Sequence, residues 1–312
     1  MLTALVTGGA GFIGANLVSR LLKLKYKVVV IDNLSTGFHH HLPLNNKNLI
    51  FYQKSINENL KPILHKHKID YLFHLAAQTN VHKSLQNPIY DAEINILGSL
   101  NIIKEAAKIK IKKFIYASTG GAVYGEPVKI PVSESHSINP LSCYGASKYA
   151  AEKYLEIYHK LYGLPYIILR YANIYGPYQN PFGEGGVIAI FIHQLIQKER
   201  PSLFAYGKNK RDYIFVEDIV EANIKAMYSN KNKTYNIGTG KMTNTKQIFQ
   251  IIQHELGSSV QPKYLPDRLG EVNQISLNVN LAQKELKWKP HYSLEEGIKK
   301  TIVWFKSNPK IF

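Results

Sequence analysis

The sequence predicts an α/β protein, in which a doubly wound, mostly parallel sheet carries a smaller, interleaved C-terminal domain. Three observations lead to this prediction. Strand-like and helix-like segments alternate through the first half of the chain, a glycine-rich stretch joins the first strand to the first helix, and the second half is less regular. Strands that alternate with helices of this length imply right-handed βαβ crossovers, and therefore a mostly parallel sheet.

The first three elements show the pattern clearly. Residues 2–7 form an apolar run that leads directly into glycines, as expected of a strand. In residues 12–25 the apolar side chains, among them Leu17 and Leu21, recur at helical spacing and predict a helix. Residues 28–31 read Val-Val-Val-Ile, which is typical of a strand buried on both faces.

The remainder of the first half repeats these patterns. Long stretches with helical spacing predict helices over residues 88–108 and 143–162. Short apolar runs predict strands at residues 49–52, 71–77, 114–118 and 165–170.

The second half gives weaker signals. Residues 173–186 are rich in Gly, Pro, Asn and Tyr and predict a mobile loop. Beyond it we expect helices at 187–198, 217–228, 245–256 and 293–305, and strands at 213–216 and 234–237. The predicted domains are a dinucleotide-binding domain of residues 1–174, to which 213–240 return, and a substrate domain of residues 175–212 and 241–312.

Composition places the chain among soluble globular proteins. Of its 312 residues, 45% are apolar and 20% charged, which excludes collagen-like, mucin-like and wholly disordered classes. No apolar run approaches the roughly 20 residues of a membrane helix, and no charged segment or cleavage pattern of a signal peptide precedes the first strand. The single cysteine, Cys143, cannot form an internal disulfide, so we expect a cytoplasmic protein.

The charge balance is strongly basic, with 39 Lys and Arg against 22 Asp and Glu. The lysines are scattered, and no basic block is interleaved with aromatic residues, so nucleic-acid binding is not expected. A solvated lysine surface is the favoured interpretation, and a site for an anionic small molecule is the alternative.

A dinucleotide-binding motif follows the first strand. Gly8, Gly11 and Gly14 form a variant of the Rossmann fingerprint, with a strand before it and a helix after it. Gly8 suits a tight turn, Gly11 lets a pyrophosphate approach the backbone, and Gly14 allows close packing of helix on strand. Asp32, at the end of the second strand, can accept the adenosine ribose hydroxyls and repels a 2′-phosphate, so we expect NAD rather than NADP.

A second motif places a phenol and an ammonium on one helical face. Tyr144 and Lys148 are four residues apart, and a neighbouring cation favours the phenolate of a tyrosine that would otherwise be a poor base. A hydroxyl at the end of the fifth strand, Ser118 or Thr119, can hold the reacting oxygen. These residues predict acid–base chemistry coupled to hydride transfer.

These motifs together resemble the extended short-chain dehydrogenases/reductases, and among them the NAD-dependent nucleotide-sugar epimerases and dehydratases. The resemblance covers nearly the whole chain. Besides the glycine stretch and the Tyr–Lys pair, it rests on Asp32-Asn33, residues 74–78, Asn95, residues 118–125, residues 169–173, Gly207, residues 211–213, Arg268 and Gly270-Glu271.

The resemblance implies roles for residues at matching positions. It implies dinucleotide contacts from Phe12, Ile13, Asn33, Ser35, Thr36, Gly37, Ser55, Ile56, Leu75, Ala76, Ala77, Gln78, Asn95, Ser118, Tyr144, Lys148, Tyr171 and Ile174. It implies contacts to the nucleotide sugar from Thr119, Tyr144, Asn173, Val187, Leu203, Phe204, Tyr206, Arg211, Arg268, Glu271 and Ile275. Simpler interpretations stay open: Asn95 as a satisfied polar core residue, and Arg211 and Arg268 as surface ion-pair partners.

Two positions depart from the family's pattern. Where the family commonly has a Gly-Asp pair after the third strand, this chain has Ser55-Ile56, so the adenine contact must be weaker or come from the backbone. The pair Gly120-Gly121 lengthens the loop after the fifth strand by one residue. Either Ser118 or Thr119 could then be the catalytic hydroxyl, and we favour Thr119.

The same loop bears on the reaction. Dehydratases of the family usually place acidic residues here to protonate a leaving hydroxyl, whereas this chain has Gly120, Gly121 and Ala122. The resemblance therefore implies C4 epimerisation of a UDP-hexose, in which NAD is regenerated at each turnover. The glucose/galactose pair, the N-acetylated pair and a uronic acid all remain open, because Ile275 has intermediate size at the position that limits a 2-acetamido group. A dehydratase, a 4-keto reductase and a non-catalytic dinucleotide-sensing module are the alternatives.

The remaining expectations concern metals and assembly. Adjacent histidines such as 39–41 rarely converge on one ion, so we expect no metal site there. In the family, helices at 88–108 and 143–162 form a dimer interface, so we expect a homodimer.

Overall fold

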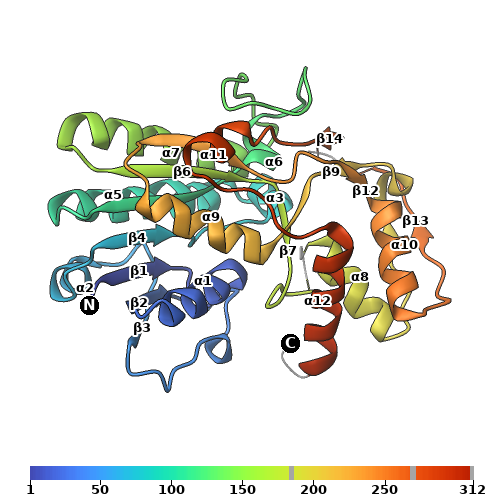
Figure 1. The fold of residues 1–312 in the computed structure, drawn as a ribbon. Helices are drawn as coiled ribbons and strands as arrows, with labels where there is room; N and C mark the ends of the chain where they lie inside the picture. The colour runs from blue at the N-terminus through green and yellow to red at the C-terminus, as the bar shows by residue number, and fades with distance from the viewer. Residues whose placement is uncertain (183–185, 268–271, 310–312) are drawn as a thin grey trace.

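A computed structural model describes residues 1–182, 186–267 and 272–309 of the chain. Its centre is a seven-stranded sheet in the order β11-β6-β5-β4-β1-β2-β3, in which every pairing is parallel (Figure 1). The strand order reverses between β1 and β4, which is where doubly wound sheets bind ligands. The predicted fold class is confirmed. The strands are β1 (Thr3–Thr7), β2 (Lys27–Asp32), β3 (Leu49–Gln53), β4 (Tyr71–His74), β5 (Lys113–Thr119), β6 (Tyr166–Tyr171) and β11 (Lys233–Ile237).

Helices cover both faces of the sheet because its strands are apolar on both. Val28 and Val30 of β2 face α1 (Phe12–Lys23) and α9 (Val216–Tyr228), whereas Val29 and Ile31 face the opposite core. That second core is covered by α2 (Lys61–Lys66), α5 (Ser99–Lys108) and α7 (Cys143–Tyr162). The continuous Val/Ile run is thus explained by burial on two sides.

The stretch predicted as one helix at 88–108 is divided. Pro88–Ala92 forms α4, Glu93–Gly98 is π-helical, and α5 follows. Hydrophobic spacing alone does not reveal a π segment, which often marks a functional site. Among the described residues, sequence periodicity also missed four helices too short to show it: α2, α3 (Val81–Gln86), α6 (Gly120–Val123) and α11 (Asn280–Glu285).

The second unit surrounds its own hydrophobic core. Helices α8 (Val187–Ile196), α10 (Thr245–Leu256) and α12 (Leu294–Ser307) pack together, and Asn244 and Ser293 cap the last two with complete capping boxes. The predicted loop at 173–186 is wrong at its start, because β7 (Asn173–Tyr175) pairs with β10 (Tyr213–Phe215). Short strands complete the unit: β9 (Lys210–Arg211) lies between β12 (Thr243–Asn244) and β14 (Gln274–Ile275), and β8 (Ser202–Leu203) pairs with β13 (Lys263–Tyr264).

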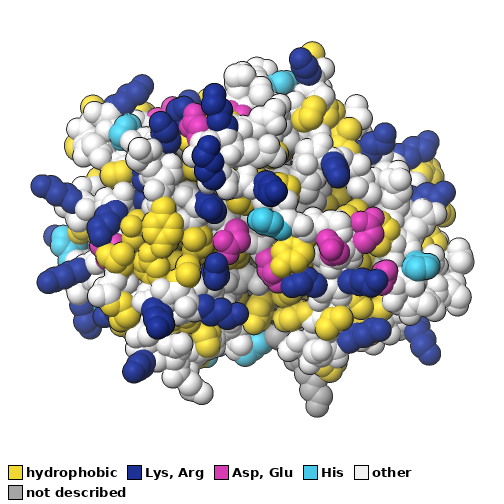
Figure 2. Space-filling model, viewed as in Figure 1, with side chains coloured by type: hydrophobic (Ala, Val, Ile, Leu, Met, Phe, Trp, Pro, Cys, Tyr) yellow, Lys and Arg dark blue, Asp and Glu magenta, His cyan; other side chains and the backbone are white. Residues whose placement is uncertain are grey.

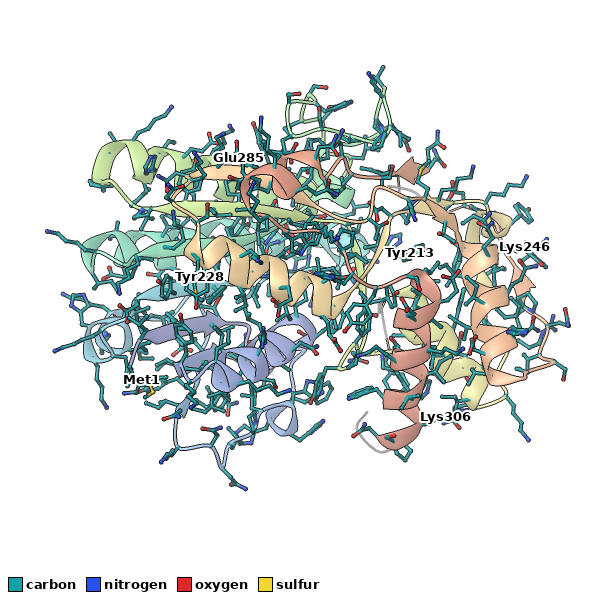
Figure 3. The ribbon with its side chains drawn as sticks, in the orientation of Figure 1. Met1, Tyr213, Tyr228, Lys246, Glu285 and Lys306 are labelled. Carbon is teal, nitrogen blue, oxygen red and sulfur yellow. The ribbon has the colours of Figure 1, made fainter. Side chains whose placement is uncertain are left out.

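The C-terminal part of the chain returns to the large sheet. Leu277 and Trp288 belong to the same core as α1 and α9. Glu285 of α11 accepts hydrogen bonds from Tyr235 (2.7 Å) and Lys233 (2.8 Å), which attaches this helix to β11 (Figure 3). Residues 277–288 therefore pack with the first domain, whereas the sequence predicts them in the second, and the domain boundaries stay a prediction.

The surface shows no organised basic region on the face in view. Lys and Arg side chains are distributed over it, with fewer Asp and Glu among them (Figure 2). Among the helices of the described residues, none is long and apolar enough to cross a membrane.

Candidate active site

A cavity of about 740 Å³ lies where the sheet meets the second unit. The loop after β4, the end of β5 and the start of α7 form its inner wall, and α8 and β9 form its outer wall. Tyr213 lies at this junction (Figure 3). A cavity of this size at a topological switch point is the expected ligand site of such a fold.

The glycine stretch forms one end of the site. Gly8 has φ +69°, and a Cβ there would lie 2.7 Å from the backbone nitrogen of Ala76. A Cβ on Gly14 would collide with the carbonyl oxygen of Gly8, whereas one on Gly11 would meet only that oxygen, at 3.3 Å. Gly11 is the N-cap of α1, and no side chain caps this helix. Its first-turn N–H groups are therefore suited to an anionic group, and these residues fit a dinucleotide pyrophosphate.

Asp32 supports this bend. Its carboxylate accepts hydrogen bonds from the backbone N–H of Ala10 (2.9 Å) and of Leu34 (2.8 Å). Burial raises the pKa of Asp32, and these backbone bonds act in the opposite direction. Each carboxylate oxygen can accept a further bond, so the side chain can still receive ribose hydroxyls as predicted.

Tyr144 and Lys148 lie together on the cavity wall. The N-cap Ser142 begins α7 by accepting from Gly145 N–H, and Tyr144 N–H donates to Ser84 (3.1 Å), which fixes the first turn. Burial raises the pKa of Tyr144 to about 12, and a side-chain hydrogen bond with Thr119 works against that rise.

The burial and the pKa of Lys148 differ from what the sequence predicts. Lys148 is 3% exposed, its Nζ lies 4.3 Å from the ring centroid of Tyr116, and burial lowers its pKa to about 7. The sequence predicts that its charge lowers the pKa of Tyr144. In the structure the pKa of Tyr144 is instead raised, by burial and by the charge of Asp91.

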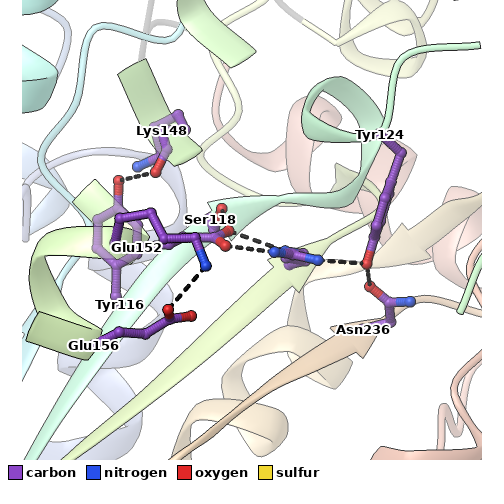
Figure 4. Close-up of polar contacts among 9 residues, drawn as sticks. Tyr116, Ser118, Tyr124, Lys148, Glu152, Glu156 and Asn236 are labelled. Carbon is purple, nitrogen blue, oxygen red and sulfur yellow. Dashed lines mark hydrogen bonds and ion pairs between the residues drawn. The ribbon is translucent and has the colours of Figure 1, made fainter. Parts of the chain in front are cut away.

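The two candidate hydroxyls have different partners. Ser118 is 4% exposed, and its hydroxyl donates a hydrogen bond to Glu152 (2.5 Å). The same carboxylate accepts hydrogen bonds from Nε (3.0 Å) and Nη2 (2.5 Å) of Arg170. Arg170 also donates a hydrogen bond from Nη1 to the hydroxyl of Tyr124 (2.9 Å) (Figure 4). Thr119 instead hydrogen-bonds Tyr144, so its hydroxyl is the one that lies beside the candidate base.

Asn95 is buried behind the cavity. Its amide accepts from the N–H of Gln78 (2.9 Å) and donates to the carbonyl of Gln78 (2.9 Å), to Asp91 (3.1 Å) and to Ser147 (3.1 Å). It does not line the cavity. The structure therefore places Asn95 as a support for the loop after β4.

The structure brings many predicted residues to one cavity. They are Phe12, Ile13, Leu75, Ala77, Ser118, Thr119, Tyr144, Lys148, Tyr171, Asn173, Ile174, Val187, Phe204 and Arg211.

Other predicted residues lie elsewhere. Ile275, paired with Arg211, is 2% exposed, and Leu203 is fully buried; both belong to hydrophobic cores. Tyr206 is 55% exposed, and Ile56 is a core residue. On the adenosine side, Asn33, Ser35 and Thr36 are exposed, Ser55 is half-buried and Gly37 is buried against Ala10. Arg268 and Glu271 lie outside the described residues.

Sequence reasoning missed several polar residues of the cavity wall. Gln194 is the clearest, because it follows Val187 by seven residues and therefore shares its face of α8. That spacing could have identified it. Asn209 and Thr245 also line the cavity; Asn209 comes from a segment without a periodic pattern, and Thr245 begins the predicted helix α10.

Of the three histidines at 39–41, His41 has a structural role. His41 is buried, its ring nitrogen Nδ1 lies 3.0 Å from the carbonyl oxygen of Ala10, and burial lowers its pKa to about 4. Over the ranges that the structure describes, no three His, Cys, Asp or Glu side chains are grouped to hold a metal ion.

Comparison with known proteins agrees with this geometry. The NAD-dependent epimerase/dehydratase family matches residues 4–238. A putative UDP-glucose 4-epimerase of Methanocaldococcus jannaschii is 45% identical over 97% of this chain and 98% of its own length. The crystal structure of a UDP-glucose 4-epimerase from Thermotoga maritima with UDP-glucose superimposes with a TM-score of 0.96, at 44% identity over 99% of this chain and 100% of that one.

A second similar solved structure is that of a 4-epimerase named for a different sugar nucleotide. The UDP-N-acetylglucosamine 4-epimerase of Methanobrevibacter ruminantium, in complex with UDP-N-acetylmuramic acid, has a TM-score of 0.94 and 36% identity, with 98% of this chain and 99% of that one covered. The chain belongs to the NAD-dependent epimerase/dehydratase family.

Proposed function

We propose that this protein is an NAD-dependent UDP-sugar 4-epimerase that interconverts UDP-glucose with UDP-galactose, or the N-acetylated pair. The observation that carries the proposal is the cavity lined by Thr119, Tyr144 and Lys148 together with Phe12 and Ile13, which directly follow the glycine bend. The adjoining residues Gly120–Val123 form a short helix with no ionisable side chain, so an acid for eliminating water is lacking there. The 4-epimerases among its relatives support the same reaction.

In this proposal Tyr144 takes the proton of the C4 hydroxyl while Thr119 holds the oxygen. NAD, when bound, supplies the acceptor and donor of hydride for C4. Lys148 lies next to Tyr144, and its ammonium stabilises the phenolate when the lysine is protonated. After the sugar has turned and hydride has returned to the opposite face of C4, Tyr144 gives the proton back to the C4 oxygen, so one residue serves as base and acid.

The nucleotide part of the substrate anchors the sugar during this exchange. Arg211 lies on the cavity wall, and its guanidinium suits a diphosphate. We assign Asn173, Val187 and Phe204 to the same nucleotide, as their place in the cavity supports. Binding energy from this remote anchor holds the 4-keto sugar while it turns.

A substrate panel tests the reaction. Purified protein is incubated with UDP-galactose, UDP-N-acetylgalactosamine and UDP-glucuronate, and the products are identified by NMR. We expect conversion at C4 of one of the first two, without consumption of added NADH. No interconversion of any of the three, or a product that has lost water, would contradict the proposal.

The glycine bend gives a second prediction, because Gly11 and Gly14 differ in what surrounds them. A methyl group at Gly11 meets only one backbone oxygen, at 3.3 Å, but occupies the approach to the helix N-terminus. We expect Gly11→Ala to fold, with a free energy of unfolding within about 1 kcal/mol of the parent, and to lose NAD binding. Calorimetric titration with NAD measures the binding, and urea denaturation measures the stability.

Gly14→Ala is the matched comparison. Its methyl group collides with backbone atoms of Gly8, so we expect reduced stability as well as lost binding. If Gly11→Ala binds NAD normally, the pyrophosphate lies elsewhere and this assignment fails.

The assembly is also a proposal. Apolar side chains on α4, on the π segment and on α7 are exposed, including Ile89 (71%), Leu97 (59%) and Leu161 (66%). A second copy of the chain that packs on these helices would bury them, which supports the homodimer.

A further inference from the structure

Asp91 is a fully buried carboxylate that no cation of the described ranges contacts. It lies on α4 and is 0% exposed. Its Oδ1 accepts from Gln78 Nε2 (2.7 Å) and Asn95 Nδ2 (3.1 Å), both neutral amides. Among the described residues its Oδ2 has no hydrogen-bond partner. Burial of an ionised carboxylate is very unfavourable unless another charge compensates it, so a nearby cation is expected.

A chain of hydrogen bonds leads from Asp91 to the catalytic turn of α7. Asn95 Nδ2 also donates to Ser147 Oγ (3.1 Å), and Ser147 Oγ donates to the carbonyl of Tyr144 (3.0 Å). Ser147 directly precedes Lys148. The carboxylate is thus tied to the backbone that carries both Tyr144 and Lys148.

The other charged or titratable groups around Lys148 are already accounted for. Glu152, one turn further along α7, is paired with Arg170 at both oxygens. His74 on β4 is fully buried, and burial lowers its pKa to about 3, so it is neutral near pH 7. Tyr116 on β5 presents its ring to the ammonium, and its own pKa lies well above the usual value. Of these neighbours, Asp91 carries the negative charge that no direct ion pair neutralises.

We propose that Asp91 is a positioning residue that acts as the buried counter-charge of Lys148 and, through Asn95 and Ser147, sets the turn that carries the Tyr144–Lys148 pair. The catalytic importance of this role rests on the proposed function, whereas the electrostatic coupling does not. The negative charges of Glu152 and, to a smaller extent, of Asp91 raise the pKa of Lys148, and Asp91 also raises the pKa of Tyr144. Lys148 and Tyr144 are therefore both held more tightly to their protons by the charge of Asp91.

Asp91→Asn removes the charge with little change in shape. Protonation of Lys148 becomes harder and ionisation of Tyr144 becomes easier, so both apparent pKa values of the pair fall. In the pH–rate profile of the NAD-loaded enzyme, both limbs should move to lower pH by about one unit, while KM for the UDP-sugar stays unchanged. Glu93→Gln is the matched control, because it removes the same charge two residues further along the helix, at an exposed position, and should leave the profile in place.

An NMR titration of the Lys148 side chain, assigned with Lys148→Met, tests the coupling without any activity. We expect the pKa of Lys148, about 7 in the parent, to fall in Asp91→Asn and to stay in Glu93→Gln. An unchanged pKa would overturn the inference. If the shift occurs but no UDP-sugar is converted, the inference stands and the proposed function fails.

If Asp91→Asn does not fold, the coupling is tested in the other direction, by changing Lys148 and observing Asp91. Coupling between two sites is mutual, so removing the cation in Lys148→Met should raise the pKa of Asp91, followed by carboxyl NMR. An unchanged Asp91 titration in that variant would show that the two side chains are independent.

Discussion

Tyr144→Phe should bind NAD as the parent does and lose turnover. The phenylalanine ring fills the same place on the cavity wall, so α7 and its contacts are preserved. Only the hydroxyl that hydrogen-bonds Thr119 is removed, and with it the proposed route of the C4 proton. We expect kcat to fall by at least about 10²- to 10⁴-fold, measured on the UDP-sugar that the panel identifies.

Tyr149→Phe is the control for this experiment. Tyr149 lies on the same helix but packs against the hydrophobic core to which α1 and α9 belong, and it does not line the cavity. Its replacement should change kcat little, and both variants should retain bound NAD, read as nucleotide released on denaturation. If Tyr144→Phe keeps more than about a tenth of the parent kcat, another group is the base.

Arg170→Met should cause the largest loss of stability among simple substitutions. Arg170 is 5% exposed, and its removal leaves Glu152 as an unpaired carboxylate with no exposed surface. Breaking a buried pair from one side typically costs about 3–5 kcal/mol. We expect a loss of that size in the free energy of unfolding, measured by urea denaturation with the m-value checked.

An exposed arginine pair on the same protein supplies the comparison. Arg20 contacts Glu221 at 2.8 Å, with side chains 40% and 35% exposed. Arg20→Met should cost less than about 1 kcal/mol because water screens that pair. The double variant Glu152→Gln/Arg170→Met should recover part of the loss, since no charge is then left buried. Equal small losses for Arg170→Met and Arg20→Met would contradict the argument.

Local patterns were enough to predict the main sheet, and they also led to the proposed chemistry. The alternation of apolar runs, the spacing of Gly8, Gly11 and Gly14, and the Tyr144–Lys148 pair are properties of short segments. Their geometry follows from the period of a strand or a helix, and the structure shows the same bend and the same helical face. These signals do not depend on distant residues, so they could be interpreted without the fold.

Short elements of the second unit were harder to predict. Strands such as β9 and β14 contain two residues each and exist because they pair with segments far along the chain. Strands this short carry no period of their own. The π segment at 93–98 likewise depends on the contacts of Asn95 across the fold.

By itself the sequence determined the fold class and predicted the nucleotide-binding bend and the acid–base pair. Only the tertiary structure shows that Glu152, 34 residues away, engages Ser118 and that Thr119 lies beside Tyr144, which supports the predicted choice of Thr119. Only the tertiary structure, too, buries Lys148, and this burial lowers its pKa against the charges of Glu152 and Asp91. The physical reason is that desolvation and partner charges act through space, between residues that the chain separates and the fold brings together.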